Sequence, residues 1–148
     1  MGQTLSHLLV HLVFSTGGRL PHINEAIEPR LHAYMGGICR NLRVIPIEIG
    51  GTDDHVHALI RIRTDTTVAS VARDLKANAS RWMHEQGVGA FEWQNGYAAF
   101  SVSESVAPRV VAYIKSQREH HRVVGFMDEL REICRRHGVE IDENHAWH

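Results

Sequence analysis

The chain has 148 residues, of which 43% are hydrophobic and 22% are charged, as is ordinary for a soluble globular protein. This length fits a single domain over residues 1–148 that buries its own core. The net charge of -1 lacks the basic excess common in nucleic-acid-binding domains, so composition alone does not indicate DNA binding. No apolar stretch approaches the roughly 20 residues that span a membrane, and the first residues do not resemble a secretory signal. We therefore expect a cytoplasmic protein.

Histidine is unusually frequent, with 12 residues, whereas the chain has only two cysteines, Cys39 and Cys134. The cysteines can form one disulfide, but their positions follow no pairing pattern, and we expect free thiols in a reducing compartment. Histidine is the commonest protein ligand of metal ions. The functional question is therefore which histidines form a site.

The first part of the chain predicts a strand, a helix and two further strands. Residues 5–15 are apolar on both alternating faces, which predicts a strand covered on both sides. Asn24 can cap a helix over residues 25–41, where apolar residues recur at helical spacing. Residues 43–49 predict a second strand and residues 55–63 a third. The glycine-containing turn between them favours antiparallel pairing.

The second part predicts a helix over residues 66–86, a fourth strand over 96–103, and two closing helices over 107–121 and 126–137. The order β-α-β-β-α-β is that of an α+β fold, the ferredoxin-like split βαβ sandwich. We expect an antiparallel sheet with helices on one face and appended C-terminal helices. Trp147 is a candidate to dock the C-terminal end.

The segment Asp54-His55-Val56-His57 opens the predicted third strand. Residues two apart in a strand point to the same face, so His55 and His57 project together while Val56 points into the core. Two imidazoles placed in this way can converge on one divalent ion. The carboxylates of Asp53 and Asp54 are available to orient them by hydrogen bonds. Such pairs are more often plain surface residues, so the motif needs a partner elsewhere in the chain.

Tyr113 and Gln117 are four residues apart in a predicted helix and therefore lie on one helical face. A tyrosine among apolar residues is most often a packing residue, and Gln117 by itself is an ordinary solvated residue. Together with the histidines they allow another interpretation. A phenol with its usual pKa near 10 is a poor nucleophile at neutral pH and needs activation or a strongly polarised target phosphate.

A metal ion held by two imidazoles and one amide oxygen would keep open positions for such a phosphate. Nitrogen and oxygen ligands without a thiolate favour Mg²⁺ or Mn²⁺, although two histidines alone leave zinc possible. The sequence thus predicts a divalent metal, Mg or Mn, as cofactor.

Four segments together resemble the single-tyrosine HUH transposases of small bacterial insertion sequences, the IS200-like transposase family. In the HUH motif two histidines flank a bulky apolar residue, here Val56. The resemblance covers nearly the whole chain, and its segments occur in the family's order and spacing. The segments are Ser6–Thr16, Gly50–Ile60, Trp93–Ser103 and Tyr113–His121.

By this resemblance His55 and His57 would bind the metal, Gln117 would be its third protein ligand, and Tyr113 would attack the DNA. The family's reaction is a transesterification that leaves a 5′-phosphotyrosine linkage and a free 3′-hydroxyl. Family members are typically homodimers, often with the tyrosine helix of one subunit serving the HUH strand of the other, and they recognise single-stranded DNA with hairpins near the ends of the element. For this chain the sequence leaves assembly in cis or in trans open. A bacterial or archaeal cytoplasm is the implied location.

Four further residues are candidates for DNA contacts. Arg73 and Lys76 lie on the second predicted helix, and Lys115 and His120 lie on the helix of Tyr113. Basic residues in these positions can contact backbone phosphates. The alternative is an ordinary solvated polar surface, and for His120 a solvated helix end.

Three functions compete on this sequence. The leading hypothesis is a metal-dependent DNA strand transferase. The second is a domesticated, non-cleaving protein that binds DNA hairpins, and the third is a small metal-binding protein unrelated to DNA. A pure binder has no reason to keep His55, His57, Tyr113 and Gln117 together, which favours the enzyme.

Overall fold

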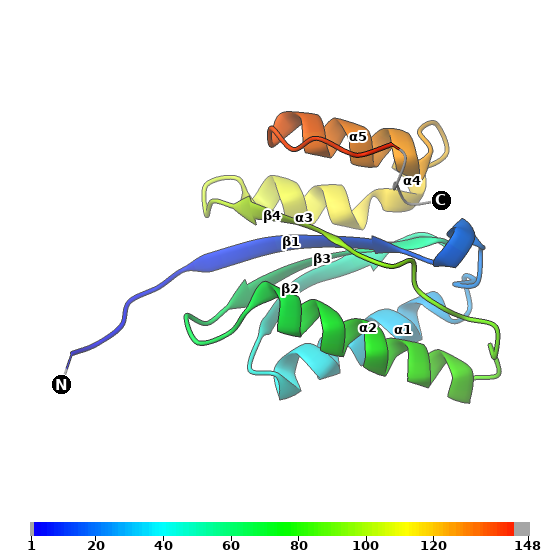
Figure 1. Cartoon of the computed structure of the whole chain (residues 1–148), viewed down its shortest axis with the longest axis horizontal. Helices are drawn as coiled ribbons and strands as arrows, with labels where there is room; N and C mark the ends of the chain where they lie inside the picture. The colour runs from blue at the N-terminus through cyan, green and yellow to red at the C-terminus, as the bar shows by residue number, and fades with distance from the viewer. Residues whose placement is uncertain (1, 144–148) are drawn as a thin grey trace.

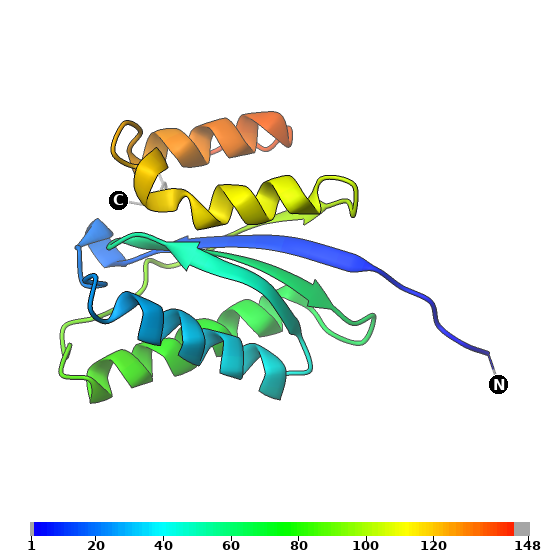
Figure 2. The same cartoon turned by 180° about the vertical axis from the view of Figure 1, so that it is seen from behind.

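The computed structural model describes residues 2–143, which fold around one four-stranded antiparallel sheet. The strand order is β2-β3-β1-β4. Two helices cover one face of this sheet, and the C-terminal helices cover the other (Figures 1 and 2). The predicted ferredoxin-like α+β sandwich with appended C-terminal helices is confirmed. In chain order the elements are β1 (Leu8–Ser15), the short η1 (Gly17–Arg19), α1 (Glu28–Asn41), β2 (Ile45–Gly51), β3 (His55–Ile62), α2 (Val68–Glu85), β4 (Ala98–Val102), α3 (Ala107–Lys115), α4 (Gln117–His120) and α5 (Phe126–Arg136).

Helix ends differ from the predicted ranges for local reasons. The Asn24 side chain does act as a cap, since its Oδ1 accepts a hydrogen bond from the backbone N–H of Ile27, but the turn that it caps precedes α1. The predicted helix over 107–121 is divided at Ser116 into α3 and α4. Trp147 lies outside the described residues. None of the described helices is long and apolar enough to cross a membrane.

The strand alternation divides the core into two layers. One set of side chains, including Leu12, Phe14 and Val56, packs against α1 and α2. The opposite face carries Leu9 and Leu59 beneath α3, and further apolar residues lie beneath α5. Both cysteines are free thiols, one in each layer, as predicted. His55 and His57 lie on the second face, against the C-terminal helices.

Gly50 allows α3 to approach the edge of the sheet. A Cβ atom at this position would lie 2.7 Å from the carbonyl oxygen of Ile114 in α3. We expect Gly50→Ala to lower the free energy of unfolding by about 1–3 kcal/mol, because α3 must move outward. Gly37→Ala in α1 is the control, since its Cβ would meet nothing within 4 Å and a helical alanine is favoured. Urea denaturation of both variants measures the difference; equal stabilities would contradict this close packing.

Candidate active site

The HUH motif lies at the start of β3, in the centre of the sheet. His55 and His57 are both 0% exposed and project towards the C-terminal helices, while Val56 packs in the opposite layer. This alternation is the one predicted from the sequence. The ring centroids of the two histidines are 5.1 Å apart, so the two imidazoles are neighbours in a buried environment.

Gln117, the first residue of α4, points directly at this pair. Its side chain is buried, and its Oε1 lies 2.7 Å from Nε2 of His55. Its amide Nε2 donates to Oε2 of Glu129 over 2.9 Å, which fixes the oxygen on the His55 side. The structure therefore brings together the three predicted metal ligands.

Polar groups contact the Nδ1 atoms of both histidines on the side away from the site. Nδ1 of His55 lies 2.7 Å from Oδ1 of Asp54 and 3.0 Å from Oγ1 of Thr52. With the proton on Nδ1 donated to Asp54, the Nε2 lone pair of His55 faces the site. Nδ1 of His57 lies 2.8 Å from Nε2 of His11 in β1, while Nε2 of His57 donates to the Glu129 carboxylate. Asp54 is thus in the orienting position that the sequence suggested.

Glu129 in the first turn of α5 occupies the middle of the cluster. It is 3% exposed, and its Oε1 lies 3.0 Å from Nε2 of His57 and 3.1 Å from Nε2 of His121. Burial alone would raise the pKa of this carboxyl, but hydrogen bonds from His121 and His57 outweigh burial and hold the pKa far below its usual range. Glu129 is therefore an anion at neutral pH, enclosed by imidazoles.

Burial has the opposite consequence for the imidazoles behind the site. It lowers the pKa of His57 to about 4 and that of His11 to about 3, because the charged form loses its hydration. For His121, hydrogen bonding to Glu129 outweighs desolvation and raises the pKa. His57 and His11 are thus neutral at physiological pH, which is the form in which an imidazole binds a metal ion.

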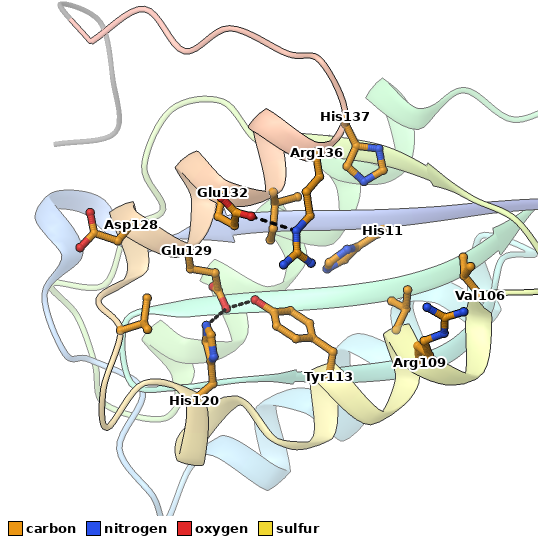
Figure 3. Close-up of a pocket in the computed structure, with 13 residues that line it drawn as sticks. His11, Val106, Arg109, Tyr113, His120, Asp128, Glu129, Glu132, Arg136 and His137 are labelled. Atoms are coloured by element: carbon orange, nitrogen blue, oxygen red, sulfur yellow. Dashed lines mark hydrogen bonds and ion pairs between the residues drawn. The ribbon is translucent and has the colours of Figure 1, made fainter.

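Tyr113 in α3 reaches the same carboxylate. Its hydroxyl donates a hydrogen bond to Oε2 of Glu129 (Figure 3). Its ring packs edge-on against His57 at 5.6 Å between centroids. Burial is the main cause that raises the pKa of this phenol, and the adjacent anion adds to it. Tyr113 is therefore neutral in this arrangement, and its attack on a phosphate requires a strong electrophile beside it.

A cavity of about 480 Å³ opens beside the Tyr113 hydroxyl. Arg109, His120 and Arg136 line it together with Tyr113 and Glu129 (Figure 3). This volume lies within the usual range for ligand pockets. Asp128, Glu129 and Glu132 also line it, and Arg136 pairs with Glu132, so Arg109 and the histidines are the groups left to face a phosphate beside the phenol.

The donor set of this cluster fits a divalent cation. Nε2 of His55 and the amide oxygen of Gln117 lie 2.7 Å apart. With the His55 proton on Nδ1, both atoms are acceptors and need a proton or a cation between them. Oε1 of the buried Glu129 carboxylate lies 3.5 Å from Nε2 of His55. Nitrogen and oxygen donors in this combination suit Mg²⁺ or Mn²⁺.

The four predicted DNA contacts fall in two places. Lys115 and His120 flank the site on α3 and α4, and His120 lies 3.4 Å from Glu129. Arg73 and Lys76 lie on α2, which covers the opposite face of the sheet (Figure 1). There Lys76 donates to the backbone carbonyls of Gln94 and Gly96, and Arg73 pairs with Asp74. The structure therefore does not bring the α2 pair to the cluster.

Sequence reasoning missed His11, His121 and Glu129. The partner of His11 is His57 on the neighbouring strand β3. In the folded sheet His11 is paired with Leu59, which is two residues from His57 and on the same face. Glu129 could have been recognised from the sequence by its position. It lies on the apolar stripe of α5 with Phe126, Leu130 and Cys134, where an acidic residue is costly unless it is paired.

Comparison with known proteins reveals one family and several similar structures. The family model "Transposase IS200 like" matches residues 4–117. No curated protein matches significantly. A candidate transposase from Deinococcus radiodurans R1 has 20% identity and a TM-score of 0.64, covering 79% of this chain and 96% of that one. A REP-associated tyrosine transposase bound to a REP hairpin has 15% identity and a TM-score of 0.62, covering 84% of this chain and 76% of that one.

Proposed function

Because this chain belongs to the IS200-like transposase family, we propose that it cleaves and rejoins single-stranded DNA by metal-dependent transesterification, with Tyr113 as nucleophile. The convergence of His55, His57 and Gln117 with the Tyr113 hydroxyl, in one buried cluster, carries this proposal. A packing tyrosine has no need of such neighbours.

His55, His57 and Gln117 would hold the cofactor, Mg²⁺ or Mn²⁺. When bound, the ion supplies a Lewis acid that polarises the scissile phosphate. Asp54 and His11 contact the Nδ1 atoms of the two imidazoles, so that Nε2 of each points towards the site. The C-terminal helices exclude bulk water from these ligands, which strengthens every electrostatic interaction among them.

The phenolic oxygen of Tyr113 forms a bond to the scissile phosphorus, and the bond from phosphorus to the 3′ oxygen breaks. The phenol donates a hydrogen bond to Oε2 of Glu129, which orients its oxygen, and the proton that the phenol loses ends on the departing 3′ oxygen. The products are a 5′-phosphotyrosine and a free 3′-hydroxyl. Attack of a 3′-hydroxyl on the phosphotyrosine restores Tyr113 and joins the strands, so bond energy is conserved.

The proposed substrate is single-stranded DNA with hairpins at the ends of an insertion sequence. One structurally similar protein is bound to a REP hairpin, and Arg109 and Arg136 here line the cavity beside Tyr113. The proposal includes a cytoplasmic homodimer, on the family resemblance. Within one chain Tyr113 already lies beside its own HUH motif, which favours cleavage in cis.

Strand cleavage on the flanks of the chain's own gene tests this function. Labelled single-stranded oligonucleotides and their duplexes are incubated with the protein and with Mg²⁺, Mn²⁺ or a chelator. We expect cleavage of a single strand only with metal, leaving a 3′-hydroxyl on one fragment. Native-gel binding to the same strand without any cleavage in Mg²⁺ or Mn²⁺ would contradict the proposal and favour the non-cleaving hairpin binder.

A further inference from the structure

We propose that Glu129 of α5 is a fourth protein ligand of the metal ion at the HUH site. The ion would then be held by two imidazoles, one amide and one carboxylate. This inference rests on the proposed function, since it concerns the ion which that function requires. It adds a charged ligand from a helix that lies beyond the catalytic tyrosine and glutamine in the chain.

The spacing of the donor atoms supports this ligand set. Oε1 of Glu129 lies 3.0 Å from Nε2 of His57 and 3.5 Å from Nε2 of His55. Oε1 of Gln117 lies 2.7 Å from the same His55 atom. Neighbouring ligands of an octahedral ion, each at about 2.1 Å from it, are about 3 Å apart. Oε1 of Glu129 therefore lies at the separation of a neighbouring ligand from Nε2 of both HUH histidines.

The charge balance of the cluster points the same way. Glu129 is a buried carboxylate. Its ion pairs within residues 2–143 are with the histidines His55, His57, His120 and His121. Its negative charge therefore faces the ring nitrogens of the proposed site, where a divalent cation would be attracted to it.

Packing holds the carboxylate in place. Phe126 and Leu130, on either side of Glu129 in α5, are buried against the sheet, and Gln117 donates to its second oxygen. His121, whose Nε2 lies 3.1 Å from Oε1, is a positioning residue for that oxygen. An anionic oxygen also shifts the preference of the site towards hard cations such as Mg²⁺ and Mn²⁺.

Metal affinity tests the proposal without reference to DNA cleavage. Mn²⁺ binding to the full chain is measured by calorimetry for the unmodified protein, Glu129→Gln and Glu132→Gln, with circular dichroism to check folding. Glu132 offers the same change one turn further along α5, where its partners are Arg135 and Arg136. We expect Glu129→Gln to weaken Mn²⁺ binding at least about tenfold, the lower limit for residues that support a metal site, and Glu132→Gln to leave it unchanged.

Unchanged or tighter Mn²⁺ binding by folded Glu129→Gln would overturn the inference and make Glu129 a competitor of the ion. His55→Ala, measured in parallel, separates this failure from failure of the metal site itself. If His55→Ala also binds Mn²⁺ normally, the ion does not bind at the HUH histidines, and the proposed function itself is contradicted.

A crystal of the unmodified chain grown with Mn²⁺ provides a test that does not depend on the folding of a variant. We expect anomalous density at the cluster with Oε1 of Glu129 within about 2.3 Å of the ion. An ion bound by His55 and His57 with Glu129 turned away would overturn the proposal.

Discussion

Replacing Tyr113 with phenylalanine is expected to lower the rate of strand cleavage at least about a thousandfold, as loss of a catalytic nucleophile typically does. The substitution removes one oxygen atom and keeps the ring contact with His57. Glu129 keeps its hydrogen bonds to His57 and Gln117, so the cluster should remain assembled. Single-turnover cleavage of a labelled oligonucleotide measures the rate, and a native gel checks that DNA binding persists.

Tyr34→Phe is the matched control for this variant. Tyr34 belongs to α1, where its ring stacks on Trp82 at 5.3 Å between centroids, on the face of the sheet away from the cluster. It loses the same hydroxyl group and should cleave at the unmodified rate. Cleavage by Tyr113→Phe within a few-fold of the control would mean that a water molecule or another residue attacks the phosphate.

Replacing either HUH histidine should strongly reduce both Mn²⁺ binding and DNA cleavage. We expect His55→Ala and His57→Ala each to weaken Mn²⁺ binding by about a hundredfold or more. Replacing a residue that only hydrogen-bonds to a metal ligand already lowers metal affinity about 10–100-fold. Cleavage should fall to the level of the unmodified protein in chelator. Calorimetry with Mn²⁺ and the cleavage assay measure the two quantities on the same samples.

His7→Ala controls for the loss of an imidazole. His7 precedes β1, and its side chain is partly exposed and pairs with Glu104 at 2.5 Å. This variant should bind Mn²⁺ and cleave DNA normally. Metal-dependent cleavage that survives in both His55→Ala and His57→Ala would place the metal site elsewhere in the molecule.

The order of elements could be predicted because each has a clear local pattern. The β1 segment is apolar at positions that face both sides of the sheet, and the α2 segment has apolar residues at helical spacing. Both patterns can be recognised in the sequence without the structure. The division at Ser116 could not be predicted in the same way. It places Gln117 at the start of a separate short helix, and both Tyr113 and Gln117 contact Glu129 across the break.

The site was predictable where its residues are close in the chain. His55 with His57, and Tyr113 with Gln117, follow from strand and helix periodicity together with the family resemblance. His11 depends on the register of β1 against β3, and Glu129 depends on how α5 returns over the sheet. Contacts of this kind join segments that are distant in the sequence, so no local pattern contains them.

Mass spectrometry of the trapped protein–DNA adduct tests the central claim most directly. After cleavage of single-stranded DNA with Mn²⁺, nuclease and trypsin digestion should leave a nucleotide remnant on the peptide Val110–Lys115, whose single tyrosine is Tyr113. Our account predicts this modified peptide, and predicts its absence in chelator. A remnant on any other peptide, or cleavage that leaves no peptide modified, would contradict the assignment of Tyr113 as nucleophile.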